Sequence, residues 1–326
     1  MPPEKFIIPI ASGKGGVGKS IFAASLATAL AGKGYDTVAV DLDLGGSNLH
    51  TYLGLPNTSP GVGDYLKQRL PSLQELMIPT GIKNLRFLPG DGKTPFMANI
   101  PTAQRFQLLR EIQQIEARYI IIDLGAGTSL NTMNFFGLSN RGVIISSLDT
   151  PSLMNSLVFL RNFIFANIIS LVQENKIIRK ELLDAYRLSA DSDHLTVADI
   201  LDRIRSYDPK LAERVKKRCS AFRPAFILNL GDRPEDLKVI GKIEATLSKN
   251  LSLNAQFLGM LFYDEAVRKA VRKNEPFLTN NPASLYGRCL EEILARLLDR
   301  NKGIEKNNLE TLIGEARKNL RGRVNR

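Results

Sequence analysis

Two lysines and a serine lie in a glycine-rich stretch near the beginning of the chain. The stretch runs from Gly13 to Ser20 and reads Gly-Lys-Gly-Gly-Val-Gly-Lys-Ser. Glycines let successive backbone N–H groups point toward one centre, where they can bind phosphate. We expect Lys19 to reach the β- and γ-phosphates of a nucleotide and the Ser20 hydroxyl to bind Mg²⁺. The residues predicted to contact ATP here are Gly13, Lys14, Gly15, Gly16, Val17, Gly18, Lys19, Ser20 and Ile21.

The segments on either side of this stretch have the patterns that a phosphate-binding loop requires. Residues 6–11 form an apolar run typical of a buried strand, and residues 21–30 are typical of a helix. The start of such a helix adds unpaired N–H groups and the positive end of the helix dipole. A glycine-rich turn with unrelated lysines has no need of these flanks, so the context favours the phosphate loop.

Carboxylates follow two further strand-like segments. Asp41 and Asp43 stand at the end of residues 37–41, and Asp123 directly follows the apolar run 119–122. In open α/β sheets the carboxyl ends of parallel strands face the ligand crevice. We therefore expect Asp123 to join the Mg²⁺ shell and Asp43 to lie near Mg²⁺ or water. A solvated acidic turn is the alternative interpretation of Asp43.

The additional lysine, Lys14, gives the pattern Lys-Gly-Gly-Val-Gly-Lys-Ser, which resembles the deviant Walker A motif of the MinD/ParA family of ATPases. The resemblance implies an ATP-dependent homodimer in which Lys14 crosses to the partner's nucleotide. It also implies that Asp43 positions the attacking water, and that Asp123 holds Mg²⁺ through water. Lys14, Lys19 and Asp43 are thus the predicted catalytic residues. Ile21 departs from the family pattern, which usually has a small hydroxyl residue there.

Three more segments share this resemblance. The family's switch I resembles Asp41 to Leu49, which would place Asn48 near the γ-phosphate. Its switch II resembles residues 123–127, where the backbone at Gly125 and Gly127 would sense that phosphate. Asn229, at the end of an apolar run, matches the asparagine that hydrogen-bonds adenine.

Residues 257–270 resemble the FlhG/FleN branch of the family, although Phe262 replaces a usual proline. The resemblance implies a slow ATPase, stimulated by a protein activator, that acts as a spatial or number regulator, for example of flagella. The implied cofactors are ATP and Mg²⁺. The implied location is the cytoplasm, with peripheral attachment to the inner face of the cell membrane as an option.

Net charge and cysteine content bear on which ligands and which classes of protein remain possible. The formal net charge is +11 and the pI is about 9.6, so nucleic acid, anionic lipid and phosphate ligands all remain open. A ParA-type partition ATPase that binds DNA is therefore the second candidate. Only Cys219 and Cys289 are present, which disfavours a zinc ribbon and an Mrp-type Fe–S carrier and fits a reducing compartment. A degenerate, binding-only protein is disfavoured because Lys19, Asp43 and Asp123 are all present.

The predicted architecture is a doubly wound α/β domain, with a mainly parallel sheet and helices on both faces, over residues 1–304. Residues of about 173–222 are charged and lack strand patterns, which indicates a helical insertion. Residues 305–326 are predicted to form a basic amphipathic helix that binds an anionic membrane, its own domain or a partner. No signal peptide is expected. Residues 157–172 are expected to form a buried helix that is too short to span a bilayer.

The sequence also predicts the N-cap residues of two helices and the buried face of one of them. Thr102 and Ser152 are predicted N-caps, since serine and threonine side chains accept hydrogen bonds from the first turn. The helix from Thr102 is predicted to bury the side chains at period 3.6. These are Phe106, Leu109, Ile112 and Ile115.

Overall fold

An eight-stranded sheet organises the computed structural model, which describes residues 4–67, 72–90, 100–188, 195–301 and 309–324. The strand order is β3-β4-β2-β5-β1-β6-β7-β8, and only the pair β3–β4 is antiparallel. The strands are β1 Phe6–Ala11, β2 Thr37–Leu42, β3 Ile78–Pro79, β4 Leu85–Leu88, β5 Tyr119–Leu124, β6 Val143–Ser147, β7 Ala225–Gly231 and β8 Gln256–Phe262. This confirms the predicted doubly wound, mainly parallel fold.

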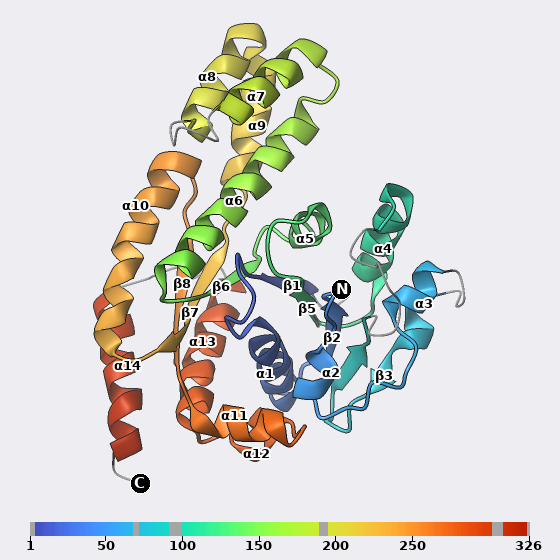
Figure 1. Cartoon of the computed structure of the whole chain (residues 1–326), viewed down its shortest axis with the longest axis vertical. Helices are drawn as coiled ribbons and strands as arrows, with labels where there is room; N and C mark the ends of the chain where they lie inside the picture. Colours follow the sequence, from blue (N-terminus) through green and yellow to red (C-terminus); the bar gives the residue numbers. More distant parts are fainter. Residues whose placement is uncertain (1–3, 68–71, 91–99, 189–194, 302–308, 325–326) are drawn as a thin grey trace.

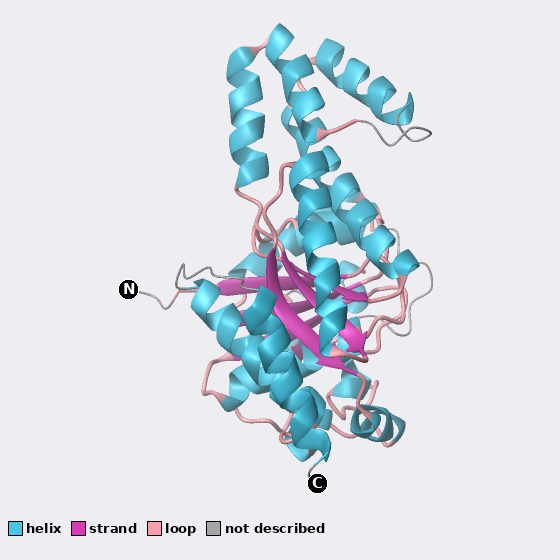
Figure 2. Cartoon of the chain, turned by 90° about the vertical axis from the view of Figure 1, so that its left-hand side faces the viewer, coloured by secondary structure: helices cyan, strands magenta, loops and turns pink. Residues whose placement is uncertain are grey.

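Strands β2, β5 and β6 are buried along their whole length, as expected for strands with helices on both faces of the sheet (Figure 2). In Figure 1, α1 and α13 lie below the sheet and α5 and α6 lie above it. The helices that surround the sheet are α1 Lys19–Gly32, α2 Leu49–Tyr52, α3 Val62–Leu66, α4 Thr102–Gln114, α5 Leu130–Phe136, α6 Thr150–Leu171, α10 Val239–Leu251, α11 Glu265–Arg272, α12 Phe277–Asn280, α13 Leu285–Asn301 and α14 Leu309–Val324. Short 3₁₀ turns form at η1 Gln74–Leu76 and η2 Pro234–Lys238.

A helical projection rises from the sheet between β6 and β7, where the sequence indicated an insertion. It contains α7 Lys176–Leu188, α8 Val197–Tyr207 and α9 Pro209–Ser220, and the upper part of α6 supports it. Its apolar stripes pack together, with Leu182, Ile204 and Val215 buried. Residues 189–194 of the predicted insertion lie outside the described residues, as do residues 305–308 and 325–326 of the predicted tail helix.

Helix α6 is longer than the apolar stretch predicted at residues 157–172. Among the described residues it is the one helix long and apolar enough to cross a membrane, so the expectation that it is too short was wrong. Its side chains Phe159, Phe163 and Ile168 are buried inside the protein. The predicted interpretation as a buried core helix is therefore the one that this packing supports.

Helix α14 is docked on its own domain. Its apolar side chains Leu312 and Ala316 are buried, and it contacts α13, η2 and β8. Arg317 forms an ion pair with Glu235 of η2, with 2.8 Å between Nη2 and Oε1. The apolar face that a membrane would contact is thus covered by the domain in this structure.

Three local predictions on α4 and α6 were wrong. Pro101, and not Thr102, occupies the N-cap of α4. Ile112 and Ile115 are buried as predicted and Leu109 is partly buried, but Phe106 is 51% exposed because the buried face runs through Leu108 instead. Asp149, and not Ser152, caps α6, because its carboxylate accepts a hydrogen bond from the Ser152 N–H at 3.0 Å.

Candidate functional site: a glycine-rich loop with two lysines

The glycine-rich loop joins β1 to α1 at the carboxyl edge of the sheet, beside the ends of β5 and β6. At two positions of the loop a side chain would collide with neighbouring atoms, so glycine is required there. A Cβ at Gly13 would lie 2.1 Å from the backbone carbon of Asn155, and a Cβ at Gly18 would lie 2.2 Å from Nδ2 of Asn229. Gly18 also has φ of 87°, a conformation that favours glycine. Gly15 has no such neighbour. The loop is therefore held tightly at both ends.

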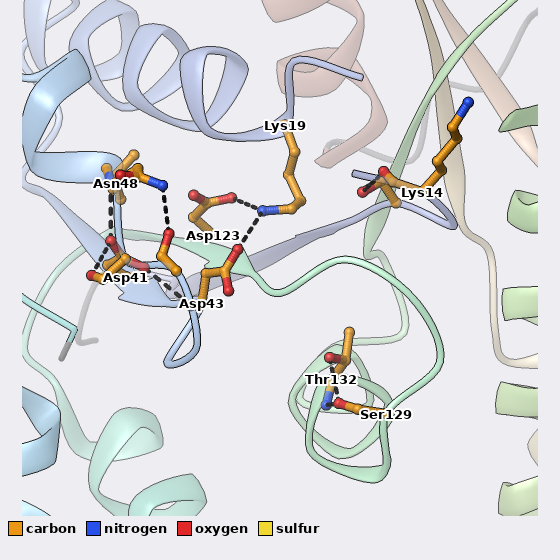
Figure 3. A network of polar contacts seen from close by, with 12 residues as sticks. Lys14, Lys19, Asp41, Asp43, Asn48, Asp123, Ser129 and Thr132 are labelled. Carbon is orange, nitrogen blue, oxygen red and sulfur yellow. Dashed lines mark hydrogen bonds and ion pairs between the residues drawn. The ribbon is translucent and has the colours of Figure 1, made fainter. Parts of the chain in front are cut away.

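Lys19 points to the inner side of the loop, toward the carboxylates of Asp123 in β5 and of Asp43 just after β2 (Figure 3). Its ammonium lies 2.7 Å from Asp123 Oδ1 and 3.9 Å from Asp43 Oδ2. The Lys19 side chain is only 7% exposed and Asp123 is fully buried. The structure thus brings together the three predicted residues Lys19, Asp43 and Asp123, which come from three different segments of the chain.

One oxygen of Asp123 remains without a protein partner. Oδ2 of this carboxylate is buried and accepts no hydrogen bond. Burial raises the pKa of Asp123, whereas the Lys19 ammonium and the Ser20 hydroxyl act in the opposite direction. Ser20 and this free oxygen are ligands that suit Mg²⁺. The described residues contain no group of three or more His, Cys, Asp or Glu side chains that could hold a metal, so phosphate oxygens and water would have to complete the shell.

Asp41 has a structural role that the sequence did not reveal. Its carboxylate accepts hydrogen bonds from the backbone N–H of Asp43 and of Leu49, both at 3.0 Å, and from the Ser47 hydroxyl at 2.6 Å. Burial and the nearby charge of Asp123 raise the pKa of Asp41 to about 7. Asp41 therefore shapes the segment that carries Asp43. Aspartate side chains often accept a hydrogen bond from the backbone N–H two residues later, and this tendency was the signal in the sequence that could have predicted the turn at Asp41.

Asn48 lies away from the Lys19 cluster. Its side chain is exposed, and its amide donates to the carbonyl of Gly46 at 2.7 Å. The expected contact between Asn48 and a γ-phosphate stays a prediction.

The predicted switch II segment is attached to the glycine-rich loop. The N–H of Gly127 donates to the carbonyl of Ser12 at 3.0 Å, and Gly127 has φ of 81°. A Cβ at Gly125 would lie 3.3 Å from Asp43 Oδ1, so the two switch segments are in contact. Ser129 then caps α5 by accepting from the Thr132 N–H (Figure 3). The backbone of Gly127 would have to exchange its bond to Ser12 in order to sense a phosphate.

Lys14 points away from this cluster, on the outer side of the loop (Figure 3). Its side chain is 49% exposed and its Nζ lies 3.6 Å from Oδ1 of Asp149. Hydrogen bonds from Ser147 and Ser152 hold the pKa of Asp149 well below its usual range, so this carboxylate is ionised at neutral pH. The two lysines of one motif therefore face opposite sides.

Asn229, near the carboxyl end of β7, contacts the glycine-rich loop at Val17. Its Nδ2 donates to the carbonyl of Val17 at 2.8 Å, and its buried Oδ1 accepts nothing. An unpaired buried oxygen next to the loop suits a ligand N–H group, such as the amino group of adenine. Ile21 is buried in the first turn of α1 and offers no polar side-chain atom to a phosphate.

The chain is similar to one family model and to curated relatives. The model of the CobQ/CobB/MinD/ParA nucleotide-binding domain matches residues 8–277. The flagellum site-determining protein YlxH of Helicobacter pylori is 32% identical over 151 residues, which are 46% of this chain and 50% of that protein. The antiactivator FleN of Pseudomonas aeruginosa is 23% identical over 281 residues, which are 85% of this chain and 81% of that protein.

Among solved structures, the septum site-determining protein MinD of Pyrococcus horikoshii OT3, complexed with Mg-ADP, aligns with a TM-score of 0.62 at 19% identity. The alignment covers 93% of this chain and 100% of that one. Because the sequence identity is low, this structural similarity shows only that the two proteins share a fold. The chain spans about half the length of several curated relatives that it matches.

Proposed function

Because the chain belongs to the CobQ/CobB/MinD/ParA nucleotide-binding family, we propose that it is an ATPase whose ATP-bound form dimerises. The observation that carries the proposal is the opposite placement of the two loop lysines. Lys19 is buried among carboxylates, and Lys14 is half exposed on the outer side. One lysine suits the chain's own nucleotide and the other suits a second molecule.

Each residue has a defined task in this proposal. The loop N–H groups and Lys19 bind the phosphates, so Lys19 must exchange its contact with Asp123 for phosphate oxygens. Ser20 and Asp123 hold Mg²⁺, which neutralises phosphate charge when bound. Asp43 lies next to Lys19 and is partly exposed, so it can orient a water molecule for attack on the γ-phosphate.

An ATP-bound dimer of this kind needs a positive charge at its interface. Two nucleotides that face each other across a two-fold axis repel, because each carries several negative charges. Lys14 would leave Asp149 and compensate the partner's nucleotide. ADP has lost the γ-phosphate that this contact needs, so the ADP form is expected to be monomeric.

The test uses Asp43→Ala to keep ATP unhydrolysed. Sedimentation-velocity centrifugation of Asp43→Ala should show a dimer with ATP and a monomer with ADP. Adding Lys14→Ala in the same background should restore the monomer. A dimer of unchanged strength without Lys14 would reject the crossing role and leave only an ATP-binding protein.

The target of the ATP form is proposed from α14 and from the relatives. The similarity to YlxH and FleN supports a role in setting the place or number of a cellular structure. We propose in addition that an activator protein stimulates hydrolysis and that the protein acts in the cytoplasm or at the inner face of the cell membrane. Membrane binding requires α14 to leave the domain, because Leu312 and Ala316 are buried. Two released helices in a dimer would bind anionic lipid far more tightly than one.

A second candidate, DNA binding of the ParA type, is favoured by the formal net charge of +11. Cosedimentation with anionic and with neutral vesicles, and gel retardation of DNA at two salt concentrations, distinguish the two. The membrane proposal expects ATP-dependent binding to anionic vesicles only, lost on deletion of residues 305–326. Salt-sensitive DNA retardation without vesicle binding would replace it.

A further inference from the structure

A buried arginine on α4 has no carboxylate partner among the described residues. Arg105 is 6% exposed, and its hydrogen bonds run to Asn131 Oδ1 at 3.2 Å and to Thr102 Oγ1 at 3.4 Å. Its Nε is buried and donates to nothing. A guanidinium has five N–H donors, so most of its bonding capacity remains unused. The ring of Phe106, with its centroid 5.9 Å away, gives the charge only weak compensation.

Arg105 lines a pocket of about 760 Å³ that is separate from the glycine-rich loop. The pocket lies where α4, α5, α6 and the beginning of α7 meet, and Figure 1 shows α5 between α4 and α6. Its volume is that of a site for a small molecule or for a few residues of a peptide. A buried, uncompensated charge that borders such a pocket indicates a ligand of opposite sign.

The charge of the lining agrees with an anionic ligand. Arg179 of α7 is a second cation on the wall, and the described lining contains no aspartate or glutamate. Two arginines in such a pocket suit a carboxylate, whose two oxygens match the planar donors of a guanidinium.

Two amides of the wall add acceptors. The Asn134 Nδ2 donates to the carbonyl of Leu130 at 2.7 Å, and the Asn167 Nδ2 donates to the carbonyl of Phe163 at 2.8 Å. These bonds lie within each asparagine's own helix, which leaves the side-chain oxygens for a ligand N–H group. Met133 and Ile169 supply apolar surface in the same wall.

We propose that this pocket binds the α-carboxylate of an N-acylated apolar amino acid, either as the last residue of a peptide or as a free molecule. Arg105 and Arg179 bind the carboxylate, Asn134 and Asn167 accept from the amide N–H, and the apolar wall contacts the side chain. Arg105 also bonds the first turn of α5, which follows the switch II segment. The pocket is therefore placed where an occupant contacts the switch region.

The test is saturation-transfer NMR on the nucleotide-free full chain, with N-acetyl-L-leucine as the probe and N-acetyl-L-leucinamide as the matched uncharged ligand. The acid should bind at least about ten-fold more tightly, because one buried charge pair contributes that much or more. Arg105→Gln should remove the difference, and Arg179→Gln, at an exposed position, should reduce it several-fold. Arg110→Gln changes an exposed arginine of α4 outside the lining and should leave it intact.

A comparison of N-acetyl-L-leucine with acetyl-Gly-Gly-Leu identifies the source of the ligand. Tighter binding of the peptide acid assigns the pocket to a chain end, and equal binding assigns it to a small molecule. Equal binding of acid and amide, equally tight binding of inorganic phosphate, or an acid preference that survives both pocket-arginine variants would overturn the proposal. No nucleotide is present, so these outcomes are independent of the ATPase proposal.

Discussion

The inner and outer sides of the glycine-rich loop place two lysines of one motif in opposite environments. Lys19 is 7% exposed and lies 2.7 Å from Asp123, whereas Lys14 is 49% exposed and lies 3.6 Å from Asp149. The inner charge is balanced inside the chain, away from solvent. The outer charge is screened by water and held weakly, so it remains available to a second molecule. Burial, and not residue type, separates the two roles.

The largest expected difference concerns removal of each charge. Lys19→Met should abolish ATP binding and lower the free energy of unfolding by about 3 kcal/mol, because it leaves the buried carboxylate of Asp123 without a cation. Lys14→Met should change stability by less than about 1 kcal/mol, as exposed ion pairs do, and retain ATP binding. Urea unfolding and calorimetric ATP titration measure both. Equal stability losses in the two variants would contradict the comparison.

The second prediction concerns the other carboxylate near Lys19. Asp43→Ala should leave ATP affinity within a few-fold and reduce hydrolysis by about 10²–10⁴-fold, because orientation of water matters only near the transition state. Phosphate release and ATP titration measure these effects separately. Asp41→Ala is the control, since it removes the acceptor of three hydrogen bonds and should lower stability instead. A large loss of ATP affinity in Asp43→Ala would remove its assigned role.

The third prediction compares glycines on the two sides of the loop. Gly18→Ala should lower the free energy of unfolding by about 2 kcal/mol. Gly18 has φ of 87°, and the Cβ of an alanine there would lie 2.2 Å from Asn229 Nδ2. Gly15→Ala, next to Lys14, has no neighbour within 4 Å and should be nearly neutral. Thermal unfolding of both variants without nucleotide checks this. Similar melting temperatures would show that the loop end at Gly18 is not tightly held.

The smallest expected effect concerns another exposed pair, Arg317 and Glu235, which joins α14 to η2. The hydrogen bond from Arg317 lowers the pKa of Glu235 below its usual value. The pair therefore contributes above the ordinary glutamate range, and its contribution is lost as pH falls through the lowered pKa. Hydrogen exchange in α14 should increase slightly at acid pH. Glu235→Gln should remove the pH dependence, and an identical pH dependence in that variant would assign it to another group.

Local sequence determined the site in outline. An apolar run before Gly13 and a helix-forming run after Ser20 are enough to predict β1, the loop and α1, because these elements are adjacent in the chain. The run before Asp123 predicts a buried strand that carries a carboxylate to the same edge, since parallel strands end together. The N-cap residues of helices were harder to predict, because a short polar cluster such as the one around Asp149 offers several possible caps.

Tertiary structure decided what each polar group contacts. Asn229 meets the carbonyl of Val17 across 212 residues of chain, and Lys19 meets Asp123 across 104. The amphipathic pattern of α14 is the same whether a membrane or the domain covers it, and only the packing of Leu312 shows the latter. Arg105 stands among surface-like residues in the sequence, yet it is buried. Periodicity reports which face of an element is apolar, whereas burial and charge balance depend on which distant elements cover that face.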